Sequence, residues 1–162
     1  MKPRKTKLSM PWLMIIVSFC LFSGNSIADK VKVSPKLLAA AESGDVESQY
    51  NLGLQLCCSG KDTKKAVAWL CRATKQNHFD APYQIGNIYS GSVRENGKMV
   101  KSFDSGYSDL SFAYMWYTVA MAQGHDAAAR GRTNLEKRMS QKQIMQGKRW
   151  ATGWKKMRCP PV

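Results

Sequence analysis

The chain has 162 residues, and 25 lysines and arginines against 11 aspartates and glutamates give it a formal net charge of +14 at pH 7. This length excludes a series of independent domains, because it suffices for one domain that buries about two thirds of its unfolded surface. The positive excess favours an anionic partner. Nucleic acid is a less favoured partner, because residues 1–28 resemble an export signal and an exported protein seldom meets nucleic acid in a specific role.

Residues 1–28 have the pattern of a secretory signal peptide. Four basic residues lie within positions 1–7, an apolar run extends from Leu8 to Phe22, and Ser26 and Ala28 form a small-x-small cleavage site. The apolar run is shorter than the roughly 20 residues of a membrane-spanning helix. We therefore expect cleavage after Ala28 and export to the periplasm or the medium, which lowers the net charge to +10. An uncleaved anchor is the alternative.

A helical hairpin pattern recurs along the rest of the chain. The helix–turn–helix pattern of Asp62–Tyr89 returns in part at Asp109–Ala128 and has an earlier echo at Leu37–Gly53. Within each helix, apolar and small residues recur at helical spacing. Equivalent positions of successive repeats are 33 residues apart for one helix of the unit and 47 residues apart for the other. Such recurrence is the mark of a repeat protein. The expected repeat core consists of Tyr50, Leu52, Gly53, Ala66, Trp69, Ala73, Ala81, Tyr83, Ile85, Gly86, Tyr89, Ala113, Trp116, Tyr117, Ala120 and Gly124.

Local signals predict where the helices begin. Ser34 and Pro35 fit the start of a short opening helix that ends at Glu42, and Asp62 is expected to cap the helix that follows it. Further helices are expected over 45–58 and 126–139. A capping box at Ser140 starts the last helix, whose apolar stripe is expected to close the open end of the stack. Gly53 and Gly86 lie within helices, which predicts close approach of a neighbouring helix backbone.

These stretches resemble the Sel-1-like repeats, which are relatives of the tetratricopeptide hairpin. The matching positions are Ala66, Trp69, Asn77, His78, Ala81, Tyr83, Ile85, Gly86 and Tyr89 in one copy and Ala113, Trp116, Gly124 and His125 in the next. The resemblance implies an all-α fold, an α/α solenoid of about three stacked antiparallel hairpins over residues 29–158 with a capping C-terminal helix. It also implies a protein that works by binding other proteins.

Residues 90–108 enlarge one loop of the repeat. Three turn dipeptides punctuate this segment, and apolar residues lie between them. A long loop in a compact domain is either functional or disordered. The segment is therefore a mobile insertion, or a flap or short hairpin that touches the partner. The spacing of Asp104, Ser105 and Asp109 fits no EF-hand loop, so we expect no metal there.

The positive charge is concentrated at the C-terminal end, in the two capping helices expected over 126–158. From Arg130 to Arg158 there are ten basic residues against the single acid Glu136. One interpretation is a solvated cap that keeps the protein soluble. The other is a basic patch that contacts a membrane headgroup layer, an envelope glycan or an acidic protein. The residues of this basic patch are Arg138, Lys142, Lys148, Arg149, Lys155 and Lys156.

Four cysteines follow the signal peptide, namely Cys57, Cys58, Cys71 and Cys159, and three pairings are possible. In an antiparallel hairpin that turns near residue 60, Cys71 lies about 12 Å along the helix from the residue opposite Cys57. A disulfide needs Cα atoms within about 7 Å of each other. We therefore expect Cys71 to be buried and unpaired, leave open how the other cysteines pair, and expect residues 159–162 to form a flexible tail.

No catalytic constellation stands out. His78 and His125 occupy equivalent turns of two repeats, which favours a structural role for both. Zinc-ligand spacing, a Ser-x-x-Lys motif and a glycine-rich phosphate loop are all missing from the sequence. We therefore expect no enzyme, no cofactor and no metal.

The stretch from Leu135 to Trp154 also resembles the closing helices of bacterial Sel-1-like proteins. The first hypothesis is therefore a non-catalytic adaptor of the bacterial cell envelope. Stacked hairpins present a concave surface built from the first helix of each pair, and amides there can hold an extended peptide by its backbone. The candidate groove residues are Asn51, Gln55, Gln84 and Asn87. The alternative is an anionic-surface binder that uses the basic patch, and a remote alternative is an envelope hydrolase. The chain is expected to be a monomer or a weak homodimer.

Overall fold

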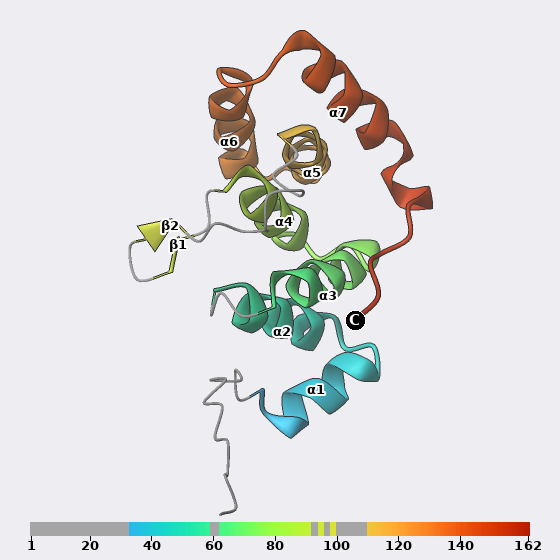
Figure 1. Ribbon diagram of the computed structural model, residues 1–162. Coiled ribbons are helices and arrows are strands. Elements are labelled where there is room, and N and C mark those ends of the chain that lie inside the picture. Colours follow the sequence, from blue (N-terminus) through green and yellow to red (C-terminus); the bar gives the residue numbers. More distant parts are fainter. Residues whose placement is uncertain (1–32, 59–61, 92–93, 96–97, 100–109) are drawn as a thin grey trace, which may run out of the picture.

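A computed structural model describes residues 33–58, 62–91, 94–95, 98–99 and 110–162 (Figure 1). The predicted signal peptide and most of the enlarged loop lie outside these residues. The helices are α1 (Pro35–Glu42), α2 (Val46–Cys58), α3 (Thr63–Lys75), α4 (Ala81–Ser90), α5 (Leu110–Ala122), α6 (Asp126–Glu136) and α7 (Gln141–Gly153), which continues into a 3-10 turn (Trp154–Lys156). The prediction of an all-α fold is confirmed. Within the enlarged loop, β1 (Arg94–Glu95) and β2 (Lys98–Met99) pair antiparallel over two residues each.

Neighbours in the chain are neighbours in space. From α1 to α6 each helix packs against the next, and α7 packs on α5 (Figure 1). Alternate helices also meet, because α2 contacts α4 and α4 contacts α6. These three helices form a continuous row, which we call the α2–α4–α6 face.

The predicted start signals of α3 and α7 are confirmed in atomic detail, whereas Ser34 precedes α1 as predicted but makes no side-chain capping bond. The backbone N–H of Ser48 donates to Asp45 Oδ1 at 2.7 Å, and the hydrogen bonds from the side chain and backbone of Ser48 lower the pKa of Asp45. Asp62 accepts from the backbone N–H of Lys65 at 3.2 Å at the start of α3. Ser140 forms a complete capping box at the start of α7. Each bond satisfies a backbone donor that the first turn of a helix leaves unpaired.

The turns between the helices show the same periodicity as the core. Gly44, Asn77 and Gly124 follow α1, α3 and α5 with φ angles of 101°, 64° and 86°. The left-handed region reverses the chain at the end of a helix and suits Gly and Asn. Gly124, which the repeat pattern assigns to the core, is exposed. Its recurrence therefore reflects this backbone conformation and not burial.

The predicted core residues of α2 to α5 are buried, apart from Tyr50 and Tyr83, which are half-buried. A Cβ on Gly53 would lie 2.7 Å from Leu70 Cγ, and one on Gly86 would lie 2.6 Å from Tyr117 Cδ1. The two glycines therefore admit the side chains of the following helix. The expectation of close backbone approach is wrong for Gly86, because the three atoms nearest to its added Cβ all belong to the ring of Tyr117.

The turn histidines make the same contact at two junctions between repeats. The His78 ring stacks on Tyr50 with 4.0 Å between centroids, and its Nε2 lies 3.3 Å from Glu47 Oε1. At the next junction the His125 ring stacks on Tyr83 at 4.3 Å, and its Nε2 lies 3.0 Å from Asp80 Oδ1. The acids and tyrosines of the two sets are 33 positions apart and the histidines 47 apart. One packing unit is thus used twice.

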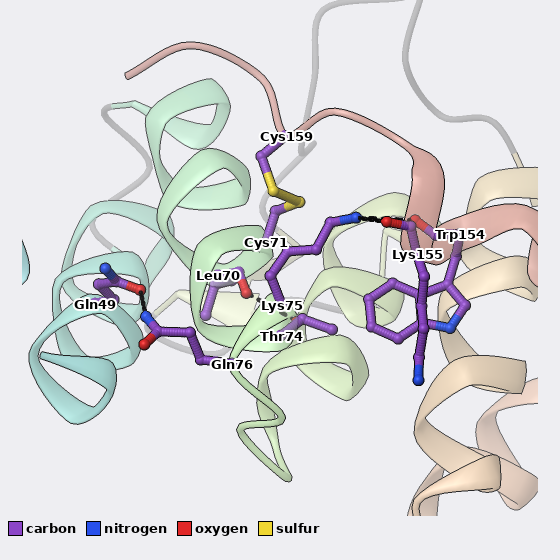
Figure 2. The surroundings of a disulfide bond; sticks show 9 residues. All are labelled: Gln49, Leu70, Cys71, Thr74, Lys75, Gln76, Trp154, Lys155 and Cys159. Atoms are coloured by element: carbon purple, nitrogen blue, oxygen red, sulfur yellow. Dashed lines mark hydrogen bonds between the residues drawn. A yellow bond between two sulfur atoms is a disulfide. The ribbon is translucent and has the colours of Figure 1, made fainter. Parts of the chain in front are cut away.

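The end of the chain returns to α3 (Figure 2). Cys71 and Cys159 form a disulfide that spans 88 residues, with 5.6 Å between their Cα atoms. Lys75 Nζ donates to the carbonyl oxygen of Trp154 at 3.2 Å and also to that of Lys155, and burial lowers the pKa of Lys75. We call the disulfide and these two hydrogen bonds the C-terminal clasp.

The clasp corrects the prediction that Cys71 is unpaired. Cys71 is buried, as expected, but the distance argument considered only Cys57 and Cys58, which precede α3 in the same hairpin. The partner comes from the far end of the chain, because α7 packs on α5 and its continuation leads back to α3 (Figure 1). Residues 159–162, predicted as a flexible tail, are therefore tethered at their first residue. Cys57 is buried as well.

Candidate binding groove

A groove of about 480 Å³ opens on the α2–α4–α6 face, between α4 and α6. Tyr83, Asn87 and Ser90 line it from α4, and Tyr117 of α5 also contributes to the lining. The residues contributed by α6 and the turn after it are Ala127, Arg130, Gly131, Asn134, Leu135 and Arg138. The lining therefore combines polar and apolar surface in about equal parts, and the described residues that form it include two arginines and no acid.

Tyr117, one of the two tyrosines of the lining, is held between two glycines. A Cβ on Gly86 of α4 would meet the Tyr117 ring at 2.6 Å, and one on Gly131 of α6 would meet it at 3.0 Å. The Tyr117 hydroxyl donates to Asn87 Oδ1 at 2.9 Å and lies 3.0 Å from Ser90 Oγ. The Tyr117 side chain is 2 % exposed and its hydroxyl is hydrogen-bonded. Tyr117 is therefore held in one position in the wall of the groove.

Arg138 forms part of the wall at the C-terminal end of α4. Its Nη2 donates to the backbone oxygen of Ser90 at 3.1 Å. Ser90 is the last residue of α4, and its carbonyl has no partner further along the helix. This bond therefore fixes the guanidinium beside the groove while its other N–H groups remain available as donors.

The structure divides the predicted groove residues between two helices. Asn51 is exposed and Gln55 is half-buried on α2, whereas Gln84 and Asn87 are half-buried on α4. Only Asn87 lines the groove, and its Nδ2 donates to Gln84 Oε1 at 3.3 Å. Since Asn87 Oδ1 accepts from Tyr117, both ends of this amide already have partners inside the protein.

Sequence reasoning missed the contribution of α6. Arg130 and Asn134 are four positions apart, and Arg138 follows four positions later, which places them on one side of a helix. This spacing was a usable signal, but α6 has weak apolar patterning and was interpreted as a cap. Arg138, predicted as part of the basic patch, is exposed and also lines the groove.

The remaining residues of the basic patch form a second surface. Lys142, Lys148 and Arg149 are exposed on α7, and Lys155 and Lys156 are exposed on the 3-10 turn. Lys142 and Arg149 line a shallow depression of about 380 Å³ together with Met145. The Met145 side chain is 67 % exposed, so this outer face of α7 combines positive charge with an apolar side chain.

Within the described part of the chain, no three His, Cys, Asp or Glu side chains gather so as to hold a metal ion. Among the helices of the same residues, none is both long and apolar enough to cross a bilayer.

Comparison with known proteins gives no relative for this chain. It matches no protein-family model, and no curated protein or solved structure is significantly similar to it.

Proposed function

We propose that the protein is a non-catalytic binding module of the bacterial cell envelope that holds a partner protein on its α2–α4–α6 face. The observation that carries this proposal is the groove, which opens where α4 and α6 lie side by side. A row of helices with fixed polar side chains suits an extended peptide better than a small apolar ligand.

The proposal includes an α/α solenoid of the Sel-1-like type with about three stacked hairpins. The repeated histidine contacts support it, because an acid, a tyrosine and a histidine join consecutive units in the same way at both junctions. The contact of each helix with the next supports it as well. A stack of this kind presents one continuous face to a partner.

Export is part of the same proposal. Disulfides form in oxidising compartments and are rare in the reducing cytosol. The pairing of Cys71 with Cys159 therefore supports the proposal that residues 1–28 are a signal peptide and that the protein meets its partner in the periplasm or the medium.

Site-specific photo-crosslinking tests the binding face. A photoreactive amino acid at position 51 of α2 and at position 84 of α4 is expected to give the same partner adduct in the cells that produce the protein. The matched control is position 65, an exposed lysine on α3. No adduct at positions 51 and 84, or an equal adduct at position 65, contradicts the proposal.

The outer face of α7 favours a second candidate function, binding to an anionic surface. Exposed Met145 lies between Lys142 and Arg149, and apolar insertion beside basic side chains is a common way to hold a lipid headgroup layer.

We expect the protein to sediment with vesicles that contain anionic lipid. The sedimented fraction should fall as salt rises, because counterions screen exposed charges. Replacing Lys148, Arg149, Lys155 and Lys156 by glutamine should abolish sedimentation. Sedimentation that ignores this change removes the second candidate.

A further inference from the structure

We propose that the groove between α4 and α6 binds acidic side chains of an extended segment of the partner, and that Arg130 and Arg138 are the residues that hold them. This inference rests on the proposed function, because it names the chemistry that the α2–α4–α6 face recognises. Three observations carry it: the charge of the lining, the position of the arginines and the spacing between them.

The charge of the lining favours an anion. Two guanidinium groups line the groove, and none of the described residues that line it is acidic. The third arginine near this wall is used differently, because Arg132 Nε lies 3.5 Å from Glu136 Oε1 and its guanidinium lies 5.4 Å from the Tyr114 ring centroid. Within the described residues Arg130 forms no such ion pair. Among the residues that the structure describes, the positive charge of Arg130 and Arg138 therefore has no acidic partner.

The position of the arginines favours carboxylates. A guanidinium presents parallel N–H donors that match the two oxygens of a carboxylate, which makes the pair both strong and directional. Arg138 is fixed by its bond to the Ser90 carbonyl, so less side-chain freedom is lost when a ligand binds. Asn134 lies between the two arginines in sequence and adds an amide that can bond to the ligand backbone.

The spacing favours an extended segment. Arg130 lies in α6 and Arg138 in the turn two residues past its end, so the two guanidinium groups line the groove at separate points along it. Over the six residues from Arg130 to Glu136 the helix rises about 9 Å, which an extended chain covers in about three residues. Acidic residues two and four positions apart in the ligand therefore point to the same side and reach both arginines. Half-buried Tyr83 offers an apolar contact to the side chains between them.

Fluorescence anisotropy tests the proposal with the full mature protein. The probe is a labelled peptide of alternating glutamate and serine, and the matched peptide has glutamine in place of glutamate. We expect the glutamate peptide to bind and the glutamine peptide not to bind. Arg130→Gln should weaken binding about tenfold or more, as expected for the loss of a charged hydrogen bond. Arg130 is chosen because its exposed side chain forms no hydrogen bond or ion pair with the other residues that the structure describes.

Two further variants complete the test. Arg149→Gln removes the same charge from the outer face of α7 and should leave the affinity within about twofold, since exposed charges at a distance are screened. Arg130→Lys keeps the charge but not the paired donors, so it should recover only part of the affinity. Equal losses with Arg130→Gln and Arg149→Gln would overturn the proposal, because they indicate attraction to net charge alone. Equal binding of the two peptides, or no binding of either, overturns it as well.

The outcome is separable from that of the proposed function. If position 51 yields a partner adduct while the glutamate peptide does not bind, the proposed binding face is supported and the proposed acidic ligand is rejected. If the peptide binds through Arg130 while positions 51 and 84 yield no adduct, the proposed anion site is supported and the proposed protein partner is rejected. Stronger, Arg130-dependent binding of an anionic polysaccharide than of the peptide would replace the acidic segment by a glycan.

Discussion

Replacing Cys159 by serine is expected to lower the free energy of unfolding by about 2–5 kcal/mol. The disulfide with Cys71 closes a loop of 88 residues, and a long closed loop restricts the unfolded chain strongly. Cys159 is the better position to change, because Cys71 is buried and its replacement would also disturb the core. Urea denaturation followed by circular dichroism measures the loss.

Two controls isolate the disulfide. The wild-type protein under reducing conditions should unfold at the same urea concentration as Cys159→Ser under either condition. Arg158→Ser changes the exposed neighbour and should have little effect, since surface substitutions usually shift stability by less than about 0.5 kcal/mol. An oxidised wild type no more stable than Cys159→Ser would show that the disulfide contributes nothing to stability.

The second large effect is expected for Tyr117→Ala. This substitution should lower the free energy of unfolding by about 3–5 kcal/mol, the range found when a buried aromatic side chain is truncated. The ring is 2 % exposed and fills the space between Gly86 and Gly131. Its loss also leaves Asn87 and Ser90 without their shared partner. Thermal or urea unfolding measures the cost.

Gly86→Ala supplies the matched test of this packing. In the wild-type background it should destabilise by about 1–3 kcal/mol, because the new methyl group would lie 2.6 Å from the Tyr117 ring. In the Tyr117→Ala background the obstacle is gone, and the higher helix propensity of alanine makes the same change neutral or stabilising by up to about 1 kcal/mol. Additive effects in the double variant would mean that the ring does not occupy the space beside Gly86.

The helices were predictable because their signals are local. Apolar residues at helical spacing fixed the buried stripes, and capping residues such as Asp62 and Ser140 fixed where α3 and α7 begin. The recurrence of His78 and His125 also indicated a shared structural role, which their contacts explain. Each of these signals acts within a few residues or through a repeat, so a single sequence contains it.

The Cys71–Cys159 disulfide was not predictable on the same basis. The pairing depends on α7 packing against α5 and on the chain then turning back toward α3, and no periodicity specifies the direction of that return. The groove shows a similar limit. Arg130 and Asn134 lie on the side of α6 away from the apolar stripe, where many residue types are tolerated, and only the packing of α6 beside α4 gives them a common site.

The C-terminal clasp has a mechanical consequence. A force that pulls on Val162 enters the molecule at Cys159 and passes through the sulfur bridge directly to Cys71 in α3. The 87 residues between the two cysteines, 72–158, carry no tension while the bridge is intact. An anchor or cargo attached at this terminus would therefore load α3 and the segments before it, and α4 to α7 would be shielded from the strain.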